Sequence, residues 1–368
     1  MASSEPQRVG LVLGAGGVLG AAWLTGALHA IASETGWDPG SADHVVGTSA
    51  GAMVGALLAC GVPPWFMIDG SLGELDDGDE SARAHRVATD GYRLHRGAPS
   101  LGPGSWRLAL SSLARPYKHS PAALLAGWLP LGPISTEPLK ETVARVCDGP
   151  WAPHPGYWAI ATDYQTGERV AFGRAGAPPA RLPDAVAASC AIPGFFRAVE
   201  IGRRRYVDGG LTSASNLDVL CTDRPDLVIA LNPMSSLHAD APRTLGERFA
   251  LAMRQASGRR LGREARRLGT AGSHVVLIQP TVHDLDAMGS NLMSARRRHN
   301  VLQTAVQTVT DHLRESPVGE LLATLPPGQP ELVRRPAHGA HARLDFDALA
   351  RGRRVDRPPG GRVAAAVV

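Results

Sequence analysis

The chain has 368 residues, of which 44% are hydrophobic and 20% charged, a balance that describes a globular protein able to bury a core. Its net charge of +4 and its aromatic content of 5% fall short of the basic footprint and the stacking surface of a nucleic-acid-binding protein. The four cysteines lie far apart and form no CxxC pair, which argues against a metal site or a disulfide framework and favours reduced thiols in the cytoplasm.

The first sixty residues contain two units in which a short apolar segment, a glycine-rich turn and a helix follow one another. Residues 9–13 read VGLVL, which is typical of a buried parallel strand, and residues 19–35 are apolar on most faces, as in a buried helix. Residues 44–46 predict a second strand and residues 52–59 a second buried helix. This alternation predicts an α/β fold with a mainly parallel sheet.

The start of the chain also has the hydropathy of a signal peptide or a membrane anchor. Residues 9–28 carry no charge, and Arg8 precedes them. A cluster of glycines interrupts this stretch, and such a cluster favours a turn over a spanning helix. We therefore expect a cytoplasmic protein without a membrane-spanning segment.

The rest of the chain predicts further helices and strands. Residues 61–130 mix acidic, basic and turn-rich stretches and predict an insertion with some helix. Residues 157–161 and 169–172 predict a hairpin, because a turn sequence separates two strand patterns. From residue 316 onward proline, glycine and arginine dominate, which predicts a loosely ordered tail. The other expected elements are helices over 184–191, 245–268 and 294–313 and strands over 205–207, 227–231 and 274–278.

Residues 47–51 read GTSAG and match the G-x-S-x-G pattern of a nucleophile elbow. The pattern is short, so it indicates a nucleophile only in the right structural context. That context is present, because Ser49 follows a predicted apolar strand and begins a predicted helix. Gly47 and Gly51 lack a Cβ, which relieves crowding at a sharp turn. We predict that Ser49 is an activated nucleophile. The alternative is a turn that only joins a strand to a helix.

A glycine-rich loop, GAGGVLG, follows the first predicted strand. Neighbouring parallel strands would place this loop and Ser49 at the same edge of the sheet. Gly16 and Gly17 can direct their N–H groups at a substrate oxygen, which makes them the candidate oxyanion hole. Gly14 and Gly20 frame the loop and are expected to support it.

Glycine-rich loops of this kind also bind dinucleotides. Here Leu19 breaks the G-x-G-x-x-G fingerprint, and no acidic residue stands at a strand end about 20 positions further on. We therefore expect no nucleotide cofactor.

A nucleophilic serine also requires a base. Asp208 follows a predicted strand and precedes Gly209 and Gly210, so its carboxylate can be aimed into a site and approached closely. The plain alternative is an aspartate that bonds to its own turn. Five histidines further along the chain do not lie in glycine-framed turns; they are His238, His274, His283, His299 and His312.

Four motifs in this order resemble those of the patatin-like phospholipase family. They are the glycine-rich loop, GTSAG, the sequence ASCAIPGFF at residues 188–196, and DGG at residues 208–210. The resemblance implies a three-layer α/β/α fold with a mainly parallel central sheet. It further implies a catalytic core over residues 9–222, completion of the α/β domain by residues 223–315, and a tail over residues 316–368.

The resemblance also implies chemistry. Ser49 corresponds to the nucleophile and Asp208 to the aspartate of a Ser–Asp dyad that needs no histidine. The loop from Gly14 to Gly20 corresponds to the oxyanion hole. The implied reaction is hydrolysis of acyl-lipid esters through an acyl-enzyme, with no metal and no other cofactor. A free carboxylate, with a pKa of about 3.9, is a poor base at neutral pH, so we predict that burial raises the pKa of Asp208.

The sequence departs from the family at two positions of the loop. Ala15 replaces a glycine, and Leu19 stands where the family usually has arginine or lysine. The backbone donors of the loop survive both changes, whereas a cation is lost. Two alternatives to a hydrolase therefore stay open: a protein that binds acyl lipids without turnover, and an acyltransferase that uses the same acyl-enzyme.

Two surface features bear on partners. Arg259, Arg263 and Arg267 share one helix face, which is either simply solvated or docks to anionic headgroups. Trp106 and Trp128 lie in the insertion, where they either enter a bilayer or pack in the core. The expected partners are an acyl-lipid substrate and an anionic membrane touched from its inner face, and no nucleic acid.

Overall fold

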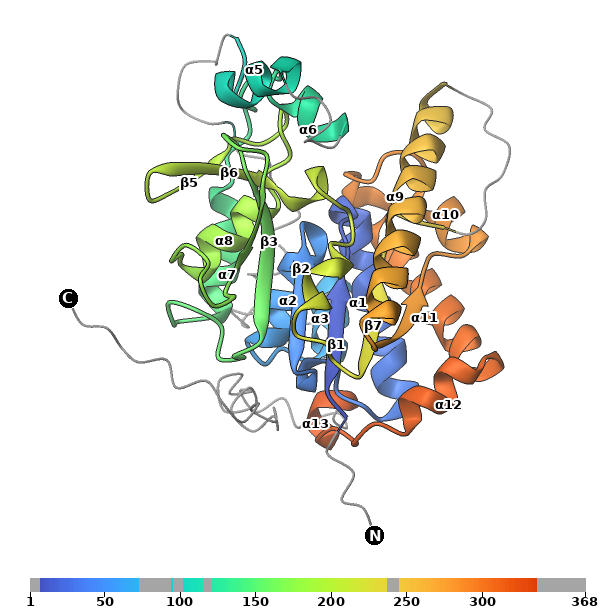
Figure 1. The fold of residues 1–368 in the computed structure, drawn as a ribbon. Coiled ribbons are helices and arrows are strands. Elements are labelled where there is room, and N and C mark those ends of the chain that lie inside the picture. The colour runs from blue at the N-terminus through green and yellow to red at the C-terminus, as the bar shows by residue number, and fades with distance from the viewer. Residues whose placement is uncertain (1–6, 73–93, 95–101, 115–120, 237–244, 336–368) are drawn as a thin grey trace, which may run out of the picture.

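A computed structural model describes residues 7–72, 94, 102–114, 121–236 and 245–335. Within these residues a mostly parallel sheet of eight strands lies between two layers of helices (Figure 1). The protein therefore has the three-layer α/β/α fold that the sequence predicts.

The strand order across the sheet is β5-β6-β3-β2-β1-β7-β8, and β4 pairs with β3. The pairs from β3 to β8 along this path are parallel, and β4, β5 and β6 form the antiparallel pairs. The antiparallel pairing of β3 with β4 confirms the predicted hairpin. The strands are β1 (Val9–Leu13), β2 (His44–Thr48), β3 (Tyr157–Asp163), β4 (Arg169–Phe172), β5 (Val199–Ile201), β6 (Arg204–Asp208), β7 (Leu227–Leu231) and β8 (His274–Ile278).

Helices cover both faces of the sheet, which explains why every residue of β1 is buried. Leu11 and Leu13 point into the larger core, which they share with α1 (Gly17–Thr35), α2 (Ala50–Ala59), α8 (Leu182–Ser189) and α11 (Arg298–Glu315). Val12 points to the opposite face, where α9 (Leu245–Thr270) and the short helix η4 (Leu217–Cys221) pack. The other helices are α3 (Pro64–Leu72), α5 (Trp106–Ala114), α6 (Pro121–Ala126), α7 (Glu137–Val146), α10 (Val282–Met288), α12 (Pro317–Ala323) and α13 (Pro330–Val333), with 3-10 turns η1 (Pro39–Ser41), η3 (Gly209–Leu211) and η5 (Ala295–Arg297).

The predicted insertion over residues 61–130 does not behave as one unit. Its first helix, α3, belongs to the main core, where Trp65 is buried. α5 and α6 lie at one end of the molecule (Figure 1) and place Trp106 and Trp128 on the surface. The acidic part of the predicted insertion, from Glu74 to Glu80, lies outside the described residues.

The prediction of a loosely ordered tail from residue 316 is wrong for the first part of that segment. Residues 317–335 include α12 and α13, whose Leu322 and Leu332 are fully buried. Two of the prolines in this segment, Pro317 and Pro330, stand in the first turn of these helices, where a missing N–H costs no hydrogen bond. Residues 336–368 of the predicted tail lie outside the described part of the chain.

The uncharged segment at the start of the chain forms β1, the glycine-rich turn and the first part of α1. In the described part of the chain, no helix combines the length and the apolar character that crossing a bilayer requires.

Candidate active site

Ser49 occupies the turn between β2 and α2 with a strained backbone. Its φ of 54° and ψ of −118° lie in a region that costs a non-glycine residue about 1–3 kcal/mol. The flanking glycines are required sterically, because a Cβ on Gly51 would collide with the carbonyl of Leu13 and one on Gly47 with the backbone of Gly51. The structure therefore places Ser49 on a sharp, glycine-flanked turn from a strand to a helix.

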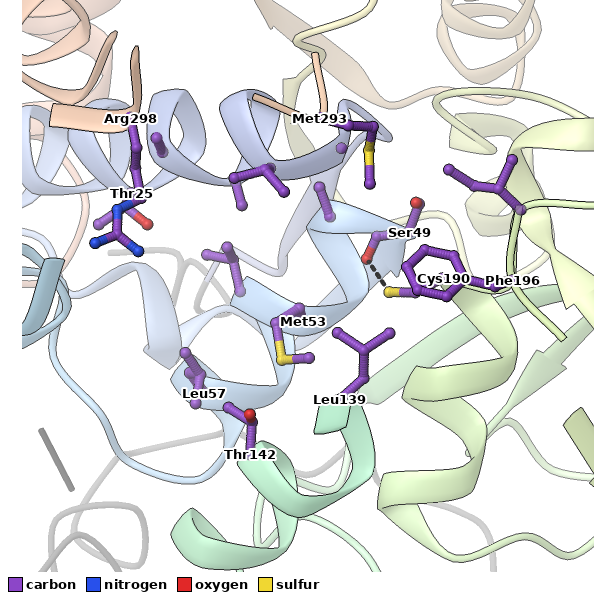
Figure 2. Close-up of a pocket in the computed structure, with 17 residues that line it drawn as sticks. Thr25, Ser49, Met53, Leu57, Leu139, Thr142, Cys190, Phe196, Met293 and Arg298 are labelled. Atoms are coloured by element: carbon purple, nitrogen blue, oxygen red, sulfur yellow. Dashed lines mark hydrogen bonds between the residues drawn. The ribbon is translucent and has the colours of Figure 1, made fainter. Parts of the chain in front are cut away.

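Two residues at the end of α8 hold this turn in place. The N–H of Ser49 donates to Ser189 Oγ at 2.9 Å, and the Ser189 hydroxyl donates to the carbonyl of Ile160 at 2.6 Å. The Cys190 thiol donates to the Ser49 carbonyl at 3.2 Å (Figure 2). Ser189 and Cys190 of the ASCAIPGFF motif thus bind the backbone N–H and the backbone carbonyl of Ser49. The sequence alone did not suggest this role for them.

Asp208 ends β6 and is buried, with 5% of its surface exposed. Its carboxylate accepts a hydrogen bond from the N–H of Gly210 at 2.7 Å, and the Ser49 side chain lies close enough to affect the pKa of the carboxyl. Burial raises the pKa of Asp208 to about 6, and the nearby Ser49 side chain and the N–H of Gly210 limit the rise. The direction agrees with the expectation from sequence. Gly209 fits because a Cβ there would collide with the carbonyl of Ile160.

Asn216 connects the two turns that carry Ser49 and Asp208. Its backbone is left-handed, with φ of 50°, and its side chain is fully buried. Its Nδ2 lies 3.1 Å from Thr48 Oγ1 and 3.3 Å from the carbonyl of Gly209, the neighbours of the two candidate catalytic residues. Sequence reasoning missed Asn216, because nothing local to it indicates a contact 168 positions away.

The glycine-rich loop lies beside Ser49, because β1 and β2 are paired and both turns leave the same edge of the sheet. The N–H groups of Gly14 and Ala15 donate to backbone carbonyls at 2.8 Å. For the N–H groups of Gly16 and Gly17, the described residues provide no acceptor. Gly17 has a φ of 63°, which favours glycine there. Gly17 is partly exposed and lines the pocket beside Ser49, whereas Gly16 is buried and is not among the residues that line this pocket.

The supporting glycines of the loop are needed for close packing. A Cβ on Gly14 would collide with Asn232 Oδ1, and Cβ atoms on Gly16 and Gly20 would press on the ring of Pro233. The loop is thus fixed against the segment that follows β7.

Leu19, which replaces the basic residue of the family, points into the core and is fully buried. A different cation supports the loop from outside it. Arg254 on α9 is 9% exposed, and its Nη1 donates at 3.0 Å to the carbonyl of Pro233, the residue packed on Gly16 and Gly20. The sequence carried no signal for this contact.

Ala50 is a third candidate donor, which sequence reasoning missed. It begins α2 directly after Ser49, and within the described residues its N–H has no acceptor. The G-x-S-x-G pattern itself provides the signal, because nucleophile elbows use the N–H that follows the serine. The N-terminus of α2 also favours negative charge at this position.

A cavity of about 120 Å³ opens beside Ser49 and is lined mainly by apolar side chains (Figure 2). Gly17, Ala50 and Cys190 line it next to Ser49. None of the histidines in the described ranges lines it, and His238 falls outside those ranges. Nor do the described residues contain a group of three or more His, Cys, Asp or Glu side chains able to hold a metal ion.

Comparison with known proteins gives one family match. The model of the family described as "Patatin-like phospholipase" matches residues 11–220. A search of curated proteins finds no match. Among solved structures, the crystal structure of VipD from Legionella pneumophila is similar, with 12% sequence identity, a TM-score of 0.37, and coverage of 85% of this chain and 68% of the VipD chain.

Proposed function

Because this chain belongs to the patatin-like phospholipase family, we propose that it is a serine lipid acyl hydrolase with Ser49 as the nucleophile and Asp208 as its base. The observation that carries the proposal is the position of Ser49, which lies on a strained, glycine-flanked turn, lines an apolar pocket and is close to the buried carboxyl of Asp208. Ester hydrolysis by a serine needs an activated hydroxyl, a base and donors for the oxyanion, and each has a candidate here.

In the first half of the proposed reaction, Ser49 Oγ forms a bond to the ester carbonyl carbon while Asp208 accepts the hydroxyl proton. The carbonyl oxygen becomes an oxyanion, and the N–H groups of Gly16, Gly17 and Ala50 donate to it. The bond to the alcohol then breaks, and Asp208 returns the proton to the departing alkoxide. The product is an acyl-enzyme on Ser49.

In the second half, water attacks the acyl-enzyme and Asp208 accepts its proton. The bond to Ser49 breaks, the fatty acid leaves, and the serine hydroxyl is restored with the proton held by Asp208. An alcohol in place of water would give acyl transfer, so hydrolysis and transfer differ only in what reaches the acyl-enzyme.

The dependence of activity on pH tests the proposed base. Asp208 must be ionised to accept a proton, and its pKa is about 6. With a soluble ester such as p-nitrophenyl butyrate, kcat/KM should fall about tenfold per pH unit below pH 6 and stay level from pH 7 to 8.5. A profile that is level down to pH 4.5 would contradict Asp208 as the base.

We also propose that α5 and α6 bind a lipid surface, with the protein peripheral to the cytoplasmic face of an anionic membrane. Trp106, Leu110 and Leu113 recur at i, i+4 and i+7 on α5, and their exposed fractions are 60%, 57% and 69%. Leu108 on the opposite side of α5 is buried in a small cluster with Val207 of β6. The apolar face is thus attached near the strand that carries Asp208, which would bring the pocket towards the lipid.

Sedimentation with anionic phosphatidylglycerol vesicles tests this surface. The double variant Trp106→Ala with Leu110→Ala should bind at least tenfold more weakly, because it removes two side chains that would be buried in lipid. The matched control is Met253→Ala, which shortens an exposed apolar side chain on α9 and should not change binding. Equal binding of the double variant and the wild type would rule out the proposed role of α5.

A further inference from the structure

Arg254 is a buried cation that no acidic side chain neutralises within the described residues. It lies on α9 with 9% of its surface exposed. Its Nη1 donates to the carbonyl of Pro233 at 3.0 Å, and its Nη2 donates to Met288 Sδ at 3.9 Å. Burial lowers the pKa of its guanidinium, because in the described part of the chain no carboxylate offsets the loss of water. A buried charge of this kind costs folding free energy and attracts a nearby anion strongly, since little water screens it.

Contacts along one face of α9 place this cation behind the glycine-rich loop. Ser257 lies on the same face of the helix as Arg254, and its hydroxyl accepts a hydrogen bond from Asn232 Nδ2 at 3.3 Å. Asn232 and Pro233 form the surface on which the loop packs, since a Cβ on Gly16 would press on the Pro233 ring. Pro233 thus contacts the guanidinium of Arg254 through its carbonyl and Gly16 through its ring.

The glycine-rich loop also borders the pocket beside Ser49. Gly17 begins α1 and Ala50 begins α2, and both residues line this pocket. In the part of the chain that the structure describes, neither backbone N–H has an acceptor. The N-terminal end of a helix favours negative charge, and two such ends line the pocket here. An anion beside Ser49 would therefore find two N–H donors, with the charge of Arg254 behind the loop.

The reaction proposed above forms two anions at this position, first the oxyanion and later the carboxylate of the free fatty acid. The ester substrate lacks this negative charge. Building on that reaction, we propose that Arg254 is a positioning residue that makes the Ser49 end of the pocket selective for negative charge. Arg254 does not line the pocket. It holds the loop through Pro233 and adds a positive field behind the N–H donors, so the fatty-acid carboxylate binds more tightly than a neutral group of the same shape.

Binding of hexanoate and hexanamide tests this selectivity without turnover, because the two probes have the same chain and similar shape but differ in charge. The protein carries Asp208→Asn, which removes a carboxylate that would repel a bound anion, and affinities are measured by NMR titration at pH 7.5. We expect hexanoate to bind at least tenfold more tightly than hexanamide. Adding Arg254→Met should weaken hexanoate about tenfold and leave hexanamide unchanged, whereas Arg254→Lys, which keeps the charge, should retain the preference.

The matched control is Arg259→Met, which removes an exposed arginine from the same helix and should preserve the preference, because water and salt screen an exposed charge. Arg254→Gln is the second neutral variant, to be used if Arg254→Met does not fold. If Arg254 only kept the loop in shape, its loss would weaken both probes equally. Equal weakening, a preference that survives the neutral variants, or no preference for hexanoate at the start would each overturn the proposal.

Hydrolysis by the protein with Asp208 intact is read separately. Arg254→Met should lower kcat for p-nitrophenyl butyrate about tenfold without a matching rise in KM, because the charge acts on the oxyanion and not on the neutral ester. An unchanged kcat would overturn the proposal. If the wild type hydrolyses no ester but the preference for hexanoate depends on Arg254, the proposed reaction is contradicted and the selectivity for negative charge stands.

Discussion

Ser49→Ala should reduce kcat for ester hydrolysis by roughly 10⁴–10⁶-fold, because no acyl-enzyme can form without the hydroxyl. The residual rate would reflect what the pocket and the oxyanion donors provide alone. The variant should fold normally: the contacts from Ser189 and Cys190 reach backbone atoms of residue 49 and do not depend on its side chain. The measurement is hydrolysis of p-nitrophenyl butyrate beside a thermal melt.

Ser33→Ala is the matched control for this variant. Ser33 is an exposed serine near the far end of α1, so its loss should leave the rate at the wild-type level. If Ser49→Ala kept more than about a tenth of the wild-type activity, the result would contradict Ser49 as a covalent nucleophile, because removing such a nucleophile lowers the rate by orders of magnitude. Another residue would then have to be the nucleophile.

Asp208→Asn should reduce kcat/KM by roughly 10³–10⁴-fold, the scale seen when a catalytic carboxylate becomes an amide. The amide oxygen can still accept the N–H of Gly210, so the turn should persist, but asparagine cannot take a proton from Ser49. The same hydrolysis assay at pH 8 measures the effect. A variant with near-normal activity would contradict Asp208 as the base.

The same substitution should also stabilise the fold at alkaline pH. The pKa of Asp208 rises from 3.8 to about 6 on burial, so its contribution to stability is fully present below pH 3.8 and lost as the pH rises through 6. This rise corresponds to about 3 kcal/mol at pH 8, which Asp208→Asn would recover. The advantage should vanish near pH 4. If Asp208→Asn loses activity but is not more stable than the wild type at pH 8, the Asp208 carboxylate is less buried than the structure shows.

The elements nearest to the candidate site could be predicted because their signals are local. An apolar strand, a glycine-framed serine and an apolar helix follow one another around Ser49, and the pairing of β1 with β2 brings the glycine-rich loop beside it. Asp208 was identified by the glycines that follow it together with the family resemblance. For these residues the immediate neighbours in sequence determine the conformation.

The supporting residues could not be predicted, because each acts across a long separation in the chain. Ser189 reaches the N–H of Ser49 over 140 positions, and Asn216 reaches Thr48 over 168. Arg254 supports the glycine-rich loop only through Pro233. Composition also misled in one place: prolines that begin α12 and α13 resembled those of a disordered tail.

Covalent labelling by a fluorophosphonate tests the activation of Ser49 most directly. Intact mass and peptide mapping would follow the wild type, Ser49→Ala and Asp208→Asn at pH 7.5. We predict one adduct on Ser49 of the wild type, none on Ser49→Ala, and much slower labelling of Asp208→Asn, since the phosphonate requires an activated serine and mimics the oxyanion. A folded wild-type protein that gains no adduct, or gains it on another residue, would contradict Ser49 as the nucleophile.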